Sequence, residues 1–157
     1  MSENIQQLSI QKVSYPSAQA DIMVDDVFID DLSLQHTLKT NYTDLFAQGR
    51  FKEFFMLYLG RTLKDLYHSK NEYLNSALPN DGETHIAPLY GCSDSCCVYL
   101  YVKVARQQSL IHWEQIGRNV AFLSPSKAIN IEWIPDFGPI TFDFDNYQQI
   151  SNILNHD

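Results

Sequence analysis

The sequence predicts a single α+β domain with a mainly antiparallel sheet, two central helices and a C-terminal helix. The 157 residues are 45% hydrophobic, which is enough apolar material to build one ordinary core. Apolar residues recur at every third or fourth position in the middle of the chain and at every second position after it. We find no linker that would separate two units, so we expect residues 1–157 to form one domain.

The first third reads as strands followed by a short helix. Residues 5–13 alternate loosely, and residues 20–29 look like a hairpin whose turn is Asp25-Asp26. Asp31 or Ser33 can then cap a short helix, because their side-chain oxygens accept hydrogen bonds from the first free N–H groups. In that helix Leu34 and Leu38 would share one face.

A longer second helix is expected from residue 51 to residue 67. Its apolar residues follow helical spacing and would form one broad stripe. They are Phe51, Phe54, Phe55, Tyr58, Leu59, Leu63, Leu66 and Tyr67. Residues 75–82, which contain Pro79 and Gly82, form the clearest loop of the chain.

The second half changes to the period of two that strands require. The predicted strands are residues 86–90, 97–104, 109–116, 129–134 and 140–142. Residues 105–108 are short enough to be a hairpin turn, and residues 135–139 form a tight connection. Asp143 or Asp145 can cap a terminal helix, whose apolar residues are Tyr147, Ile150, Ile153 and Leu154.

The charge balance restricts the class of partner. Eleven Lys and Arg against nineteen Asp and Glu give a net charge of -8. Binding to nucleic acid or to an anionic membrane needs clustered cations, so we expect neither partner. The start of the chain lacks the basic and apolar regions of a signal peptide, and three cysteines do not form a dispersed, even disulfide set. These features predict a cytoplasmic protein.

The cysteines are the first candidates for chemistry. Cys92, Cys96 and Cys97 lie within six residues, and His112 could lie near them. A zinc site usually needs a second paired module of Cys or His, and redox enzymes place C-x-x-C at the start of a helix. Neither pattern is present, and the six glycines form no phosphate-binding loop. We therefore expect no cofactor and no enzymatic activity, with a metal-binding or thiol-dependent role of Cys92, Cys97 and His112 as the alternative.

Acidic residues form two groups. The first contains Asp25, Asp26, Asp30 and Asp31, and the second contains Glu132, Asp136, Asp143 and Asp145. Neither follows the spacing of a calcium loop. Aromatic residues flank the second group, and they are Trp133, Phe137, Phe142, Phe144 and Tyr147. Carboxylates mixed with aromatic rings suit recognition of a basic protein, although aromatic residues more often belong to a core.

The second half also resembles a family of small uncharacterised bacterial proteins. The likeness spans about residues 86–154 and rests on order and spacing: a Cys92-x-Asp94 segment ending in Cys97, then Ile111-x-Trp113, then residues 138–143 reading GPITFD. The family pattern is C-x-[DE]-x-G-C, V-x-W and G-P-F-x-F-D, and this chain departs from it by having Cys96 in place of glycine. The resemblance implies no activity and no catalytic residue.

Small size, acidity and the lack of catalytic motifs together resemble the profile of immunity proteins of contact-dependent growth inhibition. The sequence thus predicts an antitoxin, a monomer or a heterodimer with its toxin. Its cognate toxin domain is expected to be a basic nuclease, which an acidic surface would attract and block. Both acidic groups are candidate contact residues.

Overall fold

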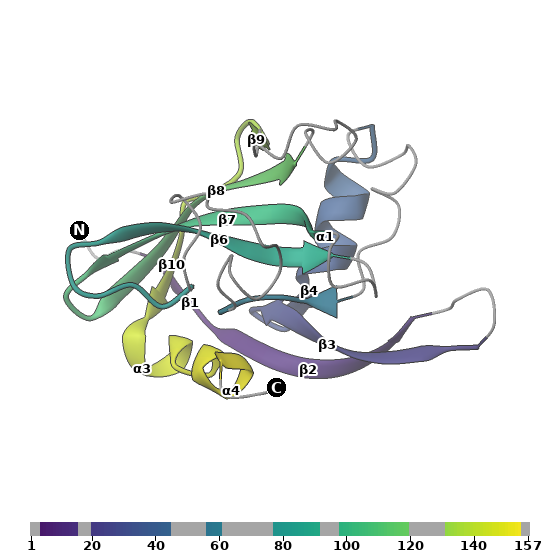
Figure 1. Cartoon of the computed structure of the whole chain (residues 1–157), viewed down its shortest axis with the longest axis horizontal. Helices are drawn as coiled ribbons and strands as arrows, with labels where there is room; N and C mark the ends of the chain where they lie inside the picture. Colours follow the sequence, from purple (N-terminus) through teal and green to yellow (C-terminus); the bar gives the residue numbers. More distant parts are fainter. Residues whose placement is uncertain are drawn as a thin grey trace.

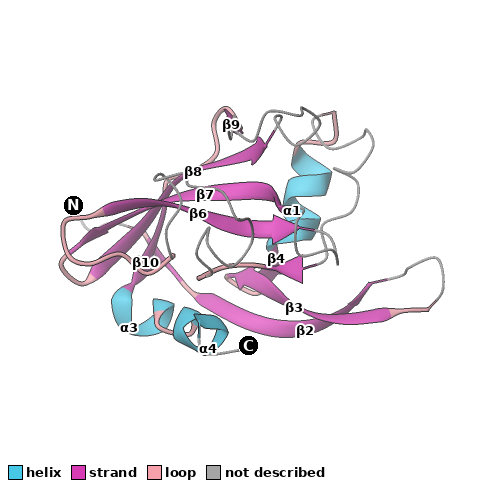
Figure 2. Cartoon of the chain, in the orientation of Figure 1, coloured by secondary structure: helices cyan, strands magenta, loops and turns pink. Residues whose placement is uncertain are grey.

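The computed structural model shows two β-sheets and three helices in the part of the chain that it describes (Figure 1, Figure 2). That part comprises residues 4–15, 20–44, 56–60, 77–91, 98–119 and 131–154. The smaller sheet comes from the first third of the chain, and the larger sheet comes mostly from the second half. The described residues therefore have the predicted α+β character.

The larger sheet has the strand order β1-β10-β8-β7-β6-β5, with β9 also paired to β8. Its strands are β1 (Ile5–Gln6), β5 (Met56–Leu57), β6 (Thr84–Gly91), β7 (Val98–Gln107), β8 (Leu110–Asn119), β9 (Ile131–Trp133) and β10 (Ile140–Asp143). All neighbours are antiparallel except β1 and β10, which are parallel. The predicted strands of the second half are thus confirmed. The predicted turn at residues 105–108 is misplaced, because β7 continues to Gln107 and the turn is Gln108-Ser109.

The smaller sheet contains β2 (Leu8–Tyr15), β3 (Ile22–Ile29) and β4 (Leu32–Ser33) in that order, all antiparallel. The predicted turn at Asp25-Asp26 is wrong, because both residues lie inside the continuous strand β3. The turn is instead Asp30-Asp31, and both residues have positive φ, 51° and 67°. Aspartate tolerates this left-handed backbone better than most residues, so the second Asp-Asp pair suits a two-residue hairpin turn.

One of the two predicted central helices lies among the described residues. The short helix is confirmed as α1 (Leu34–Asn41), and the Ser33 side chain caps it by accepting a hydrogen bond from the His36 N–H at 3.2 Å. Leu34 and Leu38 are buried as expected. Where the second helix was predicted, Met56–Leu57 is a strand that pairs with β6, and the turn after it contains Gly60 at a φ of 85°. The remainder of that predicted helix lies outside the described residues.

The predicted C-terminal helix is divided into α3 (Phe144–Tyr147) and α4 (Ile150–Leu154). Asp143 occupies the N-cap position of α3, although its side chain makes no capping hydrogen bond. The Tyr147 hydroxyl accepts a hydrogen bond of 2.8 Å from the indole N–H of Trp113. Phe142 completes this buried aromatic group, with its ring 5.2 Å from that of Trp113. Aromatic packing and one hydrogen bond therefore hold α3 against the larger sheet.

The chain passes from one sheet to the other at Gln7, between β1 and β2. The next residue, Leu8, is fixed from the opposite end of the chain. Its N–H donates to the side-chain oxygen of Asn146 at 2.7 Å, and its carbonyl accepts from the side-chain amides of Asn146 and Gln149. Figure 1 shows α3 and α4 beside the start of β2. No helix among the described residues has the length and apolar content needed to cross a membrane.

We expect Gln35→Met to raise the free energy of unfolding by about 1–2 kcal/mol. The Gln35 side chain is fully buried on α1, and neither its amide oxygen nor its amide nitrogen has a hydrogen-bond partner among the described residues. An unpaired buried amide costs free energy, and methionine fills a similar volume without that cost. Urea unfolding followed by circular dichroism measures the difference.

His36→Met is the matched control, because His36 is exposed on the same helix and reports only the gain in helix propensity. If Gln35→Met is no more stabilising than His36→Met, the Gln35 amide has a compensated environment and the prediction is wrong.

Candidate functional site: acidic residues at the junction of the sheets

Asp26 is the one candidate contact residue that is completely buried. Its carboxylate accepts hydrogen bonds from the Tyr15 and Tyr90 hydroxyls, both at 2.5 Å, and from the Ser33 hydroxyl at 3.0 Å. The N–H of Val27 also donates to it at 2.7 Å. Four donors satisfy a carboxylate that would otherwise be costly to bury. Asp26 therefore stabilises the interior and offers nothing to a partner from this position.

Three tyrosines, Tyr15, Tyr90 and Tyr147, have raised pKa values. Burial raises the pKa of Tyr90 well above its usual value, and the nearby Asp26 charge adds to the effect. Burial and the hydrogen bond to Asp26 raise the pKa of Tyr15 in the same direction. Burial also raises the pKa of Tyr147, against a small opposing effect of the Trp113 hydrogen bond. These hydroxyls consequently remain protonated donors at any physiological pH.

Two other candidates are neutralised locally by cations. Asp25 on β3 forms an ion pair of 3.1 Å with Lys12 on β2, directly across the smaller sheet. Glu132 on β9 accepts from two nitrogens of Arg118 on β8, at 2.7 and 3.0 Å. These exposed pairs carry little net charge toward solvent.

Asp30 and Asp31 form an exposed turn beside the segment that joins the sheets. The Asp30 N–H donates to the Gln7 carbonyl at 2.8 Å, and its carboxylate accepts from the Gln7 N–H at 2.9 Å. The Gln6 side-chain amide donates to the same carboxylate at 3.1 Å. This turn is therefore fixed next to Gln6 and Gln7. The Asp31 side chain is exposed and no ion pair involves it in the described part of the chain.

Asp143 and Asp145 reach the same segment from the end of the chain. In the parallel pairing of β1 with β10, Ile5 lies beside Thr141 and Gln6 beside Phe142, and Asp143 follows directly on that last pair. Asp145 directly precedes Asn146, whose side chain holds Leu8. Asp145 is exposed and Asp143 is half-buried. We call Asp30, Asp31, Asp143 and Asp145 the junction acids.

No ion pair between described residues involves a junction acid. One cation, Arg106, lies close by, with its guanidinium 3.9 Å from the centre of the ring of Phe144, the residue between Asp143 and Asp145. Arg106 donates to the carbonyls of Gln108 and Pro79, at 2.9 and 3.4 Å. Among the described residues, no ion pair joins it to a junction acid. The negative charge of the junction acids is therefore not compensated by an ion pair with a described residue. The junction acids contain two residues from each of the two acidic groups that the sequence suggested.

The rest of the second acidic group lies elsewhere. Glu132 is opposite Arg118 near one end of β8, whereas Asp143 is opposite Leu110 at the other end. Eight strand residues separate these positions by roughly 25 Å. Asp136 is exposed in the connection between β9 and β10, with a φ of 62°. The group therefore does not form one surface.

The flanking aromatic residues divide between the core and its margin. Phe142 and Tyr147 are fully buried, so they belong to the core. Trp133, Phe137 and Phe144 are half-buried. Only the second set could contribute to a contact surface.

The alternative site cannot be assembled from the described residues. Cys92, Cys96 and Cys97 lie outside them. His112 is half-buried on β8, and its Nδ1 lies 3.0 Å from the Thr141 hydroxyl on β10. In the part of the chain that the structure describes, no three His, Cys, Asp or Glu side chains are grouped so as to hold a metal ion.

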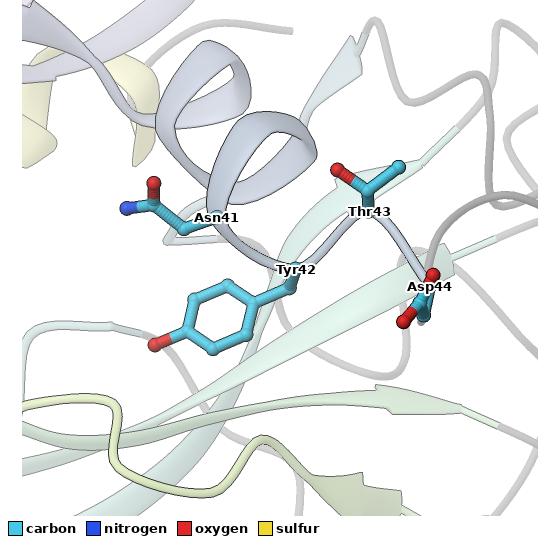
Figure 3. A pocket seen from close by; sticks show the side chains of 4 residues that line it. All are labelled: Asn41, Tyr42, Thr43 and Asp44. Carbon is cyan, nitrogen blue, oxygen red and sulfur yellow. The ribbon is translucent and has the colours of Figure 1, made fainter.

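An open pocket of about 410 Å³ lies at the end of α1 (Figure 3). It is lined by Asn41, Tyr42, Thr43 and Asp44. The Thr43 hydroxyl donates to the carbonyls of Lys39 and Thr40, at 3.0 and 3.1 Å, and the Tyr42 N–H donates to Leu38. These groups therefore serve to end the helix.

Sequence reasoning missed the partners of Asp26. Tyr15, Ser33 and Tyr90 are far from one another in the chain, and no local spacing connects them. The only available signal was an aspartate within an apolar run, which a buried strand permits if donors surround the carboxylate. The amides of Asn146 and Gln149 gave no signal at all.

We expect the free energy of unfolding to fall as pH rises above about 10. Tyrosines ionise near pH 10 in the unfolded chain, whereas the buried Tyr90 and Tyr147 keep their protons in the folded chain. A raised folded pKa gives stability that is complete below the unfolded pKa and is lost above it. Each buried tyrosine should reduce stability by about 1.4 kcal/mol per pH unit. Urea unfolding between pH 9 and 11 measures the slope.

Tyr147→Phe should remove one tyrosine's share of that slope. A stability that stays constant from pH 9 to pH 11 would show that the two hydroxyls ionise as freely when folded as when unfolded.

Tyr90→Phe should lower the free energy of unfolding by about 1.5–3 kcal/mol at neutral pH. The change removes one buried hydrogen bond to the Asp26 carboxylate and leaves the ring in place. Tyr42→Phe is the matched control, since no described residue is hydrogen-bonded to the Tyr42 hydroxyl, and it should change stability by less than about 0.5 kcal/mol. Equal effects of the two substitutions would exclude a special role for the Asp26 network. Chemical denaturation of both variants decides the matter.

Comparison with known proteins found no match. No protein-family model, no curated protein and no solved structure is significantly similar to this chain.

Proposed function

We propose that the protein is an immunity protein that binds a basic bacterial toxin domain through an acidic surface centred on the junction acids. The toxin would be a nuclease, whose cationic active-site cleft is complementary to carboxylates. The observation that carries the proposal is that Asp30, Asp31, Asp143 and Asp145 lie around the segment that joins the sheets and form no ion pair with any described residue.

Uncompensated carboxylates matter because they act at a distance. A net charge of -8 attracts a basic protein during diffusion, and a local concentration of charge orients it. The ion-paired acids contribute less to this field, because each lies beside its own cation. The junction acids are therefore the part of the surface best suited to steer a basic partner.

The half-buried Phe144 adds an apolar element beside these charges. Phe144 is the first residue of α3, directly after Asp143, and the Arg106 guanidinium packs over its ring. Interfaces commonly combine an aromatic anchor with charged residues at the rim. Phe144 and the junction acids together offer that combination.

The experiment is a rescue of growth. Genes that neighbour this one in its source genome are expressed one at a time from an inducible plasmid, with or without this chain. The proposal expects one product that stops growth alone and is tolerated when the chain is present. The two purified proteins should then form a 1:1 complex whose affinity falls as salt is added. A genome-wide expression library that yields no such product would overturn the proposal.

Neutralising the junction acids should weaken the complex with the toxin found in that screen. We expect the quadruple variant Asp30→Asn, Asp31→Asn, Asp143→Asn and Asp145→Asn to slow association at least tenfold at low salt and to flatten its salt dependence. Asparagine keeps the size of each side chain and tolerates the positive φ at Asp30 and Asp31. Stopped-flow measurements over a range of salt concentrations give the rate constants.

A control variant removes the same number of charges at positions away from the junction acids. It combines Asp25→Asn, Glu114→Gln and Glu132→Gln, whose ion-pair partners are Lys12, Lys103 and Arg118, with Glu83→Gln, whose carboxylate lies 3.3 Å from the His85 ring. We expect this variant to associate nearly as fast as the native chain. If both quadruple variants slow association equally, only the net charge matters and the junction acids are not the binding surface.

A further inference from the structure

The backbone groups of β2 alternate between facing β3 and facing outward, and the register shows which residues face outward. Gln7 and Asp30 face each other, because the Asp30 N–H donates to the Gln7 carbonyl. In an antiparallel pair the direction of the backbone groups alternates from one residue to the next. The backbone N–H and C=O groups of Leu8 therefore point away from β3, which their hydrogen bonds to Asn146 and Gln149 confirm. By the same alternation, the backbone N–H and C=O groups of Ile10, Lys12 and Ser14 point outward as well.

The side chains of Asn146 and Gln149 substitute for a neighbouring strand at Leu8. One amide oxygen accepts from the Leu8 N–H, and amide N–H groups donate to its carbonyl, as a paired strand would do. No described residue does the same for the outward N–H and C=O groups of Ile10, Lys12 and Ser14. As far as the described residues go, the outer edge of β2 is thus hydrogen-bonded at Leu8 and unpaired from Ile10 to Ser14.

This open edge belongs to an arm of the molecule. The far ends of β2 and β3 extend away from the larger sheet toward the lower right of Figure 1. Lys12 and Ser14 are exposed, and Met23, which pairs with Ser14, has 61% of its surface accessible. An accessible edge with unpaired backbone groups is a template for an added strand.

Charge indicates which strand the edge can accept. Between residues 8 and 31 the chain has five aspartates and a single basic residue, Lys12. Asp26 is buried and Asp25 is paired with Lys12, which leaves Asp21, Asp30 and Asp31 as the exposed charges with no ion pair to a described residue. Lys12 is already engaged by Asp25 across the pair. A second copy of this arm would bring like charges together, which is unfavourable. An extended segment rich in Lys or Arg would be attracted.

We propose that the outer edge of β2, from Ile10 to Ser14, binds an extended basic segment of a partner protein as an added strand. The identity of that partner, a toxin domain, rests on the proposed function. The mode of binding does not depend on it. Backbone hydrogen bonds would fix the segment, and the junction acids would guide the same partner from beside the start of β2.

The first experiment tests the mode of binding with a defined probe. The probe is a capped octapeptide of alternating lysine and valine, added to the full-length protein and followed by amide hydrogen exchange in NMR. In the free protein the N–H groups of Ser9, Gln11 and Val13 should exchange slowly, and those of Ile10, Lys12 and Ser14 rapidly. The peptide should slow exchange of the second set at least tenfold and leave the first set unchanged.

Substitution of Ser14 separates the backbone from the side chain. Ser14→Pro removes an outward N–H without removing a bond between β2 and β3, which is the position where an edge strand accepts proline. It should weaken peptide binding at least tenfold, whereas Ser14→Ala should bind as the native chain does. Circular dichroism and the slow exchange of Gln11 check that the Ser14→Pro variant remains folded.

Four outcomes would overturn the inference. These are absence of added protection with the peptide, equal binding of a glutamate–valine peptide, equal binding by Ser14→Pro, and protection of Ile10, Lys12 and Ser14 by self-association without peptide. Failure of the added strand can be told apart from failure of the proposed function. A toxin neutralised equally well by the Ser14→Pro variant would keep the function and overturn the added strand. Peptide binding at the edge, together with no toxin in the growth screen, would keep the added strand and overturn the proposed function.

Discussion

The Asp26 carboxylate on β3 accepts hydrogen bonds from β2, β4 and β6, and it thereby joins the smaller sheet to the larger one. Removing one partner from such a group leaves a buried donor or a buried charge unsatisfied, which is why the arrangement constrains the whole molecule. It fixes the position of β3 relative to Tyr90 in the larger sheet. It also orients the Ser33 hydroxyl, which caps α1. The first third of the chain is thus positioned through one side chain.

A second constraint acts where the chain changes sheets. Gln7 follows β1, which pairs with β10 in the larger sheet. Leu8 is the first residue of the smaller sheet, and it is hydrogen-bonded to the side chains of Asn146 and Gln149. Residues from the first and the last part of the described chain consequently contact each other at Leu8. The Trp113–Tyr147 hydrogen bond secures α3 there from the side of the core. The position of the junction acids follows directly from these contacts, because Asp30 is bonded to Gln7 and Asp145 precedes Asn146.

The proposed surface and the proposed strand edge both adjoin the segment Gln7–Leu8. The edge of β2 is closed by amides at Leu8 and open from Ile10, while the junction acids surround the residues just before it. Long-range charge would bring a basic partner to this region, and backbone pairing would hold it there. The two parts have different physical signatures, since the first responds to salt and the second to loss of a single N–H.

The sequence by itself determined most elements of the second half, because alternation over ten-residue strands leaves little choice of structure. It also determined α1, where Ser33 precedes an apolar helical pattern. Tertiary structure decided between the two Asp-Asp pairs, which look alike locally: hydroxyl donors from distant strands let Asp26 be buried, so Asp30-Asp31 became the turn. It likewise placed Met56–Leu57 in a strand, since pairing with β6 overrode a helical apolar pattern. The junction acids lie near one another because β1 pairs with β10 and Asp30 is bonded to Gln7. These contacts join residues far apart in the sequence, so no local pattern predicts them.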